Sequence, residues 1–170
     1  MPPGAAGYSG TPQARKLGLK PGQRVGFDSA PHGWDLADPP DGLRLPDPDG
    51  GADVIIGFFR ARSEIAARLP ALSRRIFPDG AVWAAWPRRS AGHVSDITDN
   101  DVRRHALDLG LVDVKVAAID EDWSGIRLVW RVENRRRLAS FRENPVTHRS
   151  VFEYVFGYEG ALVNGGRGLP

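Results

Sequence analysis

Two apolar stretches, ADVIIGFF at residues 52–59 and FPDGAVWAAWP at residues 77–87, decide the fold. Both contain continuous apolar runs, which are typical of parallel strands covered by helices on both faces. The segment between them, residues 61–76, has a helical spacing of apolar side chains, namely Ile65, Leu69, Leu72 and Ile76. The pattern therefore predicts a βαβ crossover.

The flanking sequence predicts further elements on both sides of this unit. Thr11 as N-cap and Pro12 at the first helical position predict a short helix that ends at Gly18. Apolar and β-branched residues predict a first strand over residues 24–28 and a second short strand over residues 43–46.

The segment after the crossover predicts a helix and a hairpin. Thr98 and Asp101 form a capping-box pattern, which predicts a helix from Thr98 to Gly110. Strands are expected over residues 111–119 and 126–132, joined by the turn 120–125. We therefore expect an α/β fold: a Rossmann-like, mostly parallel sheet with helices on both faces and a C-terminal antiparallel hairpin.

Three parts of the chain are expected to differ in order. Residues 1–10 predict a flexible N-terminus, residues 11–134 the α/β domain, and residues 135–170 a partly helical C-terminal extension with a disordered end. In the extension, Asn144 and Pro145 favour a helix start, and a helix would gather four apolar side chains on one face: Val151, Phe152, Val155 and Phe156. That face would pack on the domain or join two chains, so a homodimer through this segment is one expectation.

Composition excludes several classes of function. The 170 residues are 41% hydrophobic and 26% charged, which is ordinary for a globular protein, and the formal net charge of +2 is too small to indicate a nucleic-acid partner. The absence of Cys excludes disulfides and thiolate metal sites, and the His and Asp residues show no metal-ligand spacing, so no metal is predicted. There is no apolar run of about 18 residues and no leader-like pattern at the N-terminus. We expect a cytoplasmic protein without a membrane partner.

Candidate binding residues follow the predicted strands. In an open parallel sheet, ligands bind outside the carboxyl ends of the strands, so polar loop residues at that edge are the candidates. We expect them to form a rim that binds a small anionic ligand, and its members are His32, Arg60, Arg88, Arg89, Ser90, Asp96, Glu121 and Trp123.

Several rim residues have two interpretations. Arg88 and Arg89 suit a phosphate or carboxylate, or they are a solvated pair of loop charges. Trp123 would stack on a ligand ring or cap the sheet edge. His32 and His93 could act as acid or base, but the sequence fixes no carboxylate beside either. Catalytic residues are therefore left unassigned.

Several motifs resemble a known family. They are GYSGTP at residues 7–12 with KLG at 16–18, WPRRSAG at 86–92, DIT at 96–98 and DEDWSG at 120–125. In this order they resemble the bacterial domain-of-unknown-function family 3052, over residues 7–135. The resemblance implies a small Rossmann-like protein with no assigned activity.

The strand order and the phrase FPDGAVWAAWP also resemble class I S-adenosylmethionine-dependent methyltransferases that lack one strand pair. That resemblance implies that Asp28, Gly33 and Asp47 would contact the cofactor if it binds. The loop DSAPHG at residues 28–33 departs from the glycine-rich loop of those enzymes, because one glycine remains and Pro31 removes a backbone donor.

Three hypotheses of function follow. The leading one is a non-catalytic or regulatory binding protein on a degenerate methyltransferase-like scaffold, with its ligand at the carboxyl edge and with no cofactor. The second is a methyltransferase that uses S-adenosylmethionine and acts on a small molecule. The third is an interaction module whose unidentified protein partner binds the C-terminal tail.

Overall fold

The computed structural model describes residues 11–142, with side chains up to residue 137. The chain divides into two compact units, Met1–Arg131 and Val132–Pro170, and each is described by itself. The described part of the first contains a sheet, three α-helices and a short 3-10 helix. In the second, the described part is the helix α4, Val132–Arg142. The predicted flexible N-terminus, the helix start at Pro145 and the apolar face beyond it lie outside the described residues.

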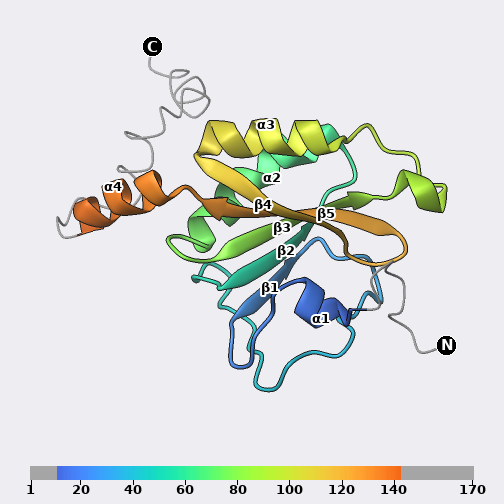
Figure 1. Ribbon diagram of the computed structural model, residues 1–170, viewed down its shortest axis with the longest axis horizontal. Helices are drawn as coiled ribbons and strands as arrows, with labels where there is room; N and C mark the ends of the chain where they lie inside the picture. The colour runs from blue at the N-terminus through green and yellow to red at the C-terminus, as the bar shows by residue number, and fades with distance from the viewer. Residues whose placement is uncertain (1–10, 143–170) are drawn as a thin grey trace, which may run out of the picture. The chain divides into compact units, whose positions relative to one another are not determined.

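A five-stranded sheet organises the first unit (Figure 1). Its strands are β1 (Val25–Asp28), β2 (Val54–Phe58), β3 (Ala81–Pro87), β4 (Leu111–Ala118) and β5 (Trp123–Trp130), in the spatial order β1-β2-β3-β5-β4. The pairs β1–β2 and β2–β3 are parallel, whereas β5 is antiparallel to both β3 and β4. All of these strands except β5 therefore run in one direction.

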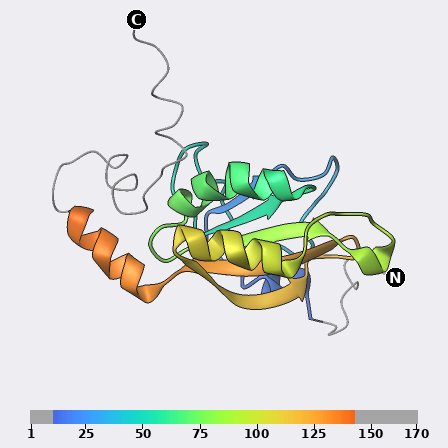
Figure 2. The ribbon, with the colours of Figure 1, turned by 90° about the horizontal axis from the view of Figure 1, so that it is seen from above.

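Helices cover both faces of this sheet. The helices α2 (Arg62–Arg75) and α3 (Asp99–Leu109) contact each other and lie side by side over one face (Figure 2). The short helix α1 (Gln13–Lys16) lies on the other face (Figure 1). The predicted α/β fold, with its βαβ crossover and C-terminal hairpin, is confirmed. No helix among residues 11–142 is both long enough and apolar enough to span a bilayer.

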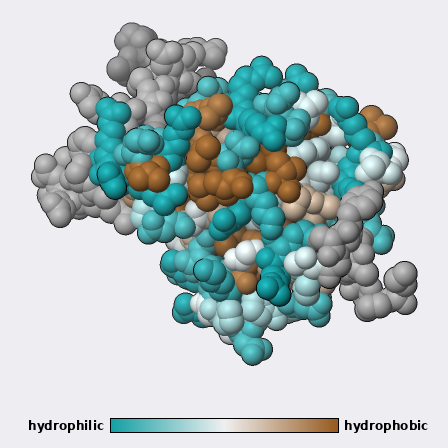
Figure 3. All heavy atoms as spheres, in the orientation of Figure 1, coloured by the Kyte–Doolittle hydropathy of each residue, from teal (hydrophilic) through white to brown (hydrophobic). Residues whose placement is uncertain are grey.

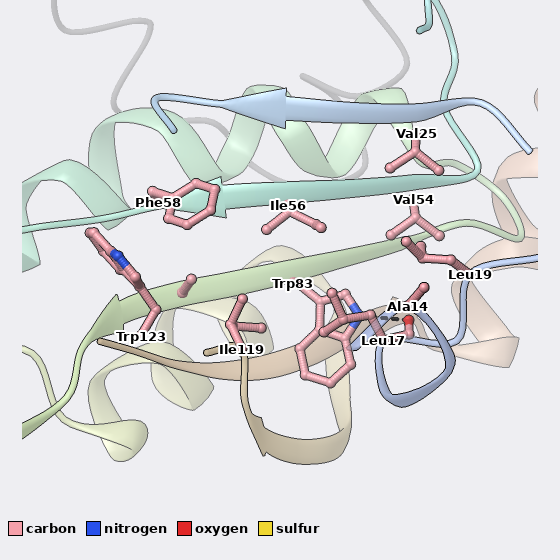
Figure 4. Packing of buried hydrophobic residues seen from close by; sticks show 11 residues of the cluster. Ala14, Leu17, Leu19, Val25, Val54, Ile56, Phe58, Trp83, Ile119 and Trp123 are labelled. Carbon is pink, nitrogen blue, oxygen red and sulfur yellow. Dashed lines mark hydrogen bonds between the residues drawn. The ribbon is translucent and has the colours of Figure 1, made fainter. Parts of the chain in front are cut away.

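Two apolar layers form because successive side chains of a strand point to opposite faces. On the α1 face, Val54, Ile56 and Phe58 of β2 join a buried cluster with Leu17 and Trp83 (Figure 4). On the other face, the buried Leu72 of α2 reaches Gly57, where an added Cβ would lie 3.0 Å from its Cδ1. Each fully buried side chain of this size contributes about 1.5–3 kcal/mol. The continuous apolar run of β2 is thus explained by burial on both faces.

Helix α3 begins and ends as the sequence predicts. Thr98 is its N-cap and accepts from the backbone N–H of Asp101, and Gly110 closes it with φ 88°. Helix α1 differs, because Pro12 occupies its N-cap position without a side-chain cap. The prediction of Thr11 as N-cap is wrong, since the helix starts one residue later than expected.

Three further boundaries differ from the prediction. The expected strand at residues 43–46 forms only an isolated bridge between Arg24 and Arg44, and Pro46, which ends the expected range, has no N–H to donate to a ladder. Strand β5 starts at Trp123 rather than at residue 126, so the hairpin turn spans residues 119–122. Residue Val132 begins α4 instead of ending that strand.

Candidate functional site

The carboxyl edge of the sheet gathers the ends of β1, β2 and β3 together with the β4–β5 turn. Asp28 ends β1, and Arg60 comes just after β2. Arg88 follows β3, and Trp123 begins β5 at the same edge, where it pairs with Pro87. The sequence predicts that Arg60, Arg88 and Trp123 lie at one edge, and the structure places them there.

A row of aromatic rings crosses this edge on the α1 face. Ring centroids are 5.7 Å apart for Phe27 and Trp34, 5.0 Å for Trp34 and Phe58, and 5.0 Å for Phe58 and Trp123. The Arg60 guanidinium lies 5.4 Å from the centroid of the Trp123 ring, at a distance suited to a cation–π contact. Because Trp123 is 9% exposed, it caps the sheet edge rather than offering a face to a ligand ring.

Arg68 of α2 occupies the space between the carboxyl ends of β1 and β2. Its guanidinium forms an ion pair with Asp28 and donates to Ser29 Oγ (2.6 Å) and to the Phe58 carbonyl oxygen (2.5 Å). The same group lies 4.5 Å from the centroid of the Phe59 ring. The Asp28 carboxylate is therefore engaged by a contact inside the chain.

The N-terminus of α2 is also closed by an internal contact. The Glu64 carboxylate accepts from the backbone N–H groups of Arg60 and of Ala61, the latter at 2.9 Å. Burial alone would raise the pKa of Glu64, but these two donors, together with the positive charges of Arg68 and Arg60, lower the pKa. Helix N-termini attract anions through free N–H groups, and here Glu64 supplies the negative charge.

Arg88 fixes the hairpin turn. Its backbone N–H donates to the Asp122 carbonyl (2.8 Å), and its guanidinium donates to the carbonyls of Asp120 (3.1 Å) and Glu121 (3.3 Å). Of the pair predicted to bind an anion, Arg88 is therefore a structural residue. Arg89 is exposed in the short 3-10 helix η1 (Arg89–Ala91).

Asp120 ties this turn to the loop after β1. Its carboxylate accepts from the backbone N–H groups of Asp122 (2.8 Å) and Trp123 (2.9 Å), and from the indole N–H of Trp34 (2.8 Å). The contact between Trp34 and Asp120 joins residues 86 positions apart. No local pattern in the sequence indicates it.

The remaining rim candidates are mostly exposed. His32, Ser90 and Glu121 are exposed, and Asp96 accepts from the backbone N–H of Arg62 through Oδ1 (2.8 Å). His93, which had no carboxylate assigned from the sequence, lies with Nε2 2.8 Å from Asp122 Oδ1. The two residues are 29 positions apart, so sequence spacing could not reveal the pair.

The three predicted cofactor residues do not come together. The Asp47 carbonyl accepts from Arg75 Nη2 (3.0 Å), and Arg75 ends α2, far along that helix from the carboxyl edge where α2 begins. The methyltransferase resemblance implies that Asp47 would share a cofactor site with Asp28, but the Asp47 turn lies beside the end of α2, since no strand forms at residues 43–46 to carry it to the carboxyl edge. Gly33 stays in an open turn with φ 73°. Within the part of the chain that the structure describes, no group of three or more His, Asp or Glu residues is placed to hold a metal ion.

The fold and this edge define an α/β domain with a Rossmann-like sheet and an internally bonded carboxyl edge. Among solved structures, the chain is similar to the magnesium protoporphyrin IX methyltransferase of Synechocystis PCC 6803 with bound SAM, at 11% identity and a TM-score of 0.44, over 65% of this chain and 71% of that one. A pericyclic reaction enzyme (11%, TM-score 0.44) and LepI in complex with SAM (12%, TM-score 0.40) each match 69% of this chain and 39% of theirs.

These similarities are too low to carry an argument about activity. No protein-family model and no curated protein matches the sequence. The resemblance to the family of unknown function therefore stays a prediction from the motifs.

Proposed function

We propose that this domain is a non-catalytic binding protein whose ligand contacts the carboxyl edge of the sheet. The position of Arg68 carries this proposal. By bonding Asp28, Ser29 Oγ and the Phe58 carbonyl, its guanidinium occupies the ends of β1 and β2, where a Rossmann-like protein holds its ligand. A reactant at that point would first have to displace a charged group with three polar partners.

The contact surface that remains is the outer part of the rim. Arg60 is exposed, and its orientation is set by the Trp123 ring and by a bond to the Ser29 carbonyl (3.2 Å). Arg89 and Ser90 are also exposed, and they follow β3 in the chain. The preorganised guanidinium of Arg60 suits a small carboxylate or phosphate ligand, because the protein has already fixed part of its geometry.

The alternative is a methyltransferase that binds S-adenosylmethionine through Asp28. It requires Arg68 to release the Asp28 carboxylate, and it requires backbone donors in a loop that contains Pro31. Both requirements oppose tight cofactor binding.

Thermal-shift titration tests the binding surface. A panel of small anions, with citrate as the first probe, should raise the melting temperature of the wild-type chain. The double variant Arg60→Gln with Arg89→Gln should lose that rise, whereas Arg74→Gln, an exposed arginine in the last turn of α2, should keep it. An equal rise of melting temperature in the double variant and in Arg74→Gln would show that the anion binds elsewhere.

A further inference from the structure

Three cationic side chains meet on the α1 face of the sheet, at the β4 side. Lys115 on β4 and Arg127 on β5 are register partners, so their side chains stand on the same face. Lys16 ends α1, and its carbonyl accepts from Lys115 Nζ at 2.7 Å. Arg127 Cζ lies 4.0 Å from the position of a Cβ at Gly18, two residues after Lys16. These contacts bring three positive charges around the end of α1.

No carboxylate neutralises this cluster within the described residues. None of the eight ion pairs found there includes Lys16, Lys115 or Arg127. The two lysines donate to backbone carbonyls, Lys16 to Ala118 at 3.3 Å, and an ammonium group has three N–H donors. Each lysine thus has donors to spare.

A cation on the opposite face of the sheet has carboxylate partners. Arg103 of α3, also partly buried, pairs with Asp99 (2.7 Å) and with Asp113 of β4 (3.0 Å). Strand β4 therefore places a carboxylate, Asp113, beside the cation Arg103 on one face of the sheet. On the other face it adds a cation, Lys115, to Lys16 and Arg127. Like charges directly opposite each other in a sheet destabilise it, so the α1 side carries an uncompensated repulsion.

Arg127 adds an independent observation. Its Nε is buried and has no hydrogen-bond partner among the residues that the structure describes. Buried polar atoms are almost always bonded, so a charged donor left without a protein partner is a position that an ion, a ligand or a water would complete.

The electrostatics of Lys16 agree with this geometry. Burial lowers the pKa of Lys16, and repulsion from Lys115 and Arg88 lowers it further. An anion bound between the cations would remove that repulsion.

We propose that Lys16, Lys115 and Arg127 form a binding site for a phosphate-type anion. Phosphate suits the cluster because its charge is close to −2 and its several oxygens accept from both ammonium and guanidinium donors. This site shares no residue with the binding surface at the carboxyl edge, because it is built from Lys16 of α1, Lys115 of β4 and Arg127 of β5.

Isothermal titration calorimetry of the full chain tests the site, with inorganic phosphate and AMP as separate probes. Arg127→Met keeps most of the stem without the charge, and Lys115→Gln removes an exposed charge. Both variants should bind phosphate at least about tenfold more weakly than the wild type. Lys20→Gln, an exposed lysine just after α1, should bind as the wild type does. The carboxyl-edge double variant, Arg60→Gln with Arg89→Gln, removes any phosphate binding at that edge and is the background in which these substitutions are compared.

A second readout separates binding from stability. In phosphate-free buffer, Arg127→Met should melt at or above the wild-type temperature, because it removes a buried donor without a partner. Stronger binding of AMP than of phosphate would identify a nucleotide site, and equal binding would identify a site for the phosphate group alone. Wild-type dissociation constants weaker than about 10 mM for both probes would overturn the proposal. Unchanged phosphate binding by Lys115→Gln would also overturn the proposal. This variant is sufficient for the test if Arg127→Met does not fold.

Discussion

Arg68 is the residue whose contacts shape the carboxyl edge, because one guanidinium joins the ends of two strands. Arg68→Met keeps the apolar stem but leaves the Asp28 carboxylate and the Phe58 carbonyl without their donor. We expect the free energy of unfolding to fall by about 2 kcal/mol, the usual cost of losing bonds to a partly buried charge. Urea denaturation measures it. Arg74→Met, on the exposed side of the same helix, should change stability by less than about 0.5 kcal/mol.

The neighbours Arg88 and Arg89 should respond very differently to substitution. Arg88→Ala removes the donor to the carbonyls of Asp120 and Glu121 and should lower the free energy of unfolding by about 1–3 kcal/mol. Arg89→Ala removes an exposed charge and should stay within about 0.5 kcal/mol. Thermal melting of the two single variants compares them directly. Equal effects would show that the carbonyl contacts of Arg88 add nothing.

At this edge, the contacts that each residue makes were harder to predict from the sequence than its position. The topology rule placed Arg60, Arg88 and Trp123 at one edge, and they are there. Their partners could not be predicted, since Arg68 meets Asp28 across 40 positions and such contacts leave no local pattern. Burial of Trp123 depends likewise on its packing against Phe58, which is set by sheet register.

At the level of elements, the caps of α1 and α3 form a matched pair for a test. Thr98 caps α3 and bonds the backbone N–H of Asp101 (3.2 Å), so Thr98→Ala should lower the free energy of unfolding by about 1 kcal/mol. Thr11 precedes Pro12 and caps nothing, so Thr11→Ala should change it by less than about 0.5 kcal/mol. Chemical denaturation of both variants measures the two changes in the free energy of unfolding. A larger effect at Thr11 would contradict the assigned start of α1.

The edge strand β4 exposes apolar surface. Val114 and Val116 are 52% and 53% exposed, and Figure 3 shows apolar side chains gathered where β4 lies in Figure 1. The register shifts between Asp113 and Lys115, which leaves Val114 without a partner in the ladder. A bulge and a lysine on an edge strand both oppose pairing with another chain.

Elements with strong local signals were predicted, and those without were not. Continuous apolar runs identified β2 and β3, and the cap residues identified α3. The strand expected at residues 43–46 did not form beyond one bridge, because Pro46 has no N–H for a ladder and two leucines around Arg44 are too weak a pattern to predict pairing. The start of α4 at Val132 was missed since its residues have no apolar stripe of helical period.

For the whole molecule, acid should weaken the fold through three aspartates. The Arg24 backbone N–H lowers the pKa of Asp53, the Arg103 guanidinium lowers the pKa of Asp99, and the Thr98 backbone N–H lowers the pKa of Asp101. An unfolded aspartate titrates near pH ~3.9, so the folded state binds fewer protons than the unfolded state near that pH. The stabilisation is fully present above about pH 5 and is lost as the pH falls through the lower folded pKa values.

Melting temperature between about pH 2 and pH 6 checks this expectation. Asp99→Asn should make the acid loss shallower, whereas Asp108→Asn, an exposed residue of the same helix, should leave its slope unchanged. A stability that rises on acidification through this range would contradict the assignment of these three contacts.

Internal bonds of Arg68 close the ends of β1 and β2, and we propose that the domain therefore binds its ligand without methyl transfer. Calorimetric titration of the full chain with S-adenosylmethionine and S-adenosylhomocysteine tests this proposal. We predict no saturable binding of either compound at micromolar concentrations. A dissociation constant at or below about 1 μM, worth about 8 kcal/mol, would show that Arg68 yields to the cofactor and would contradict the claim.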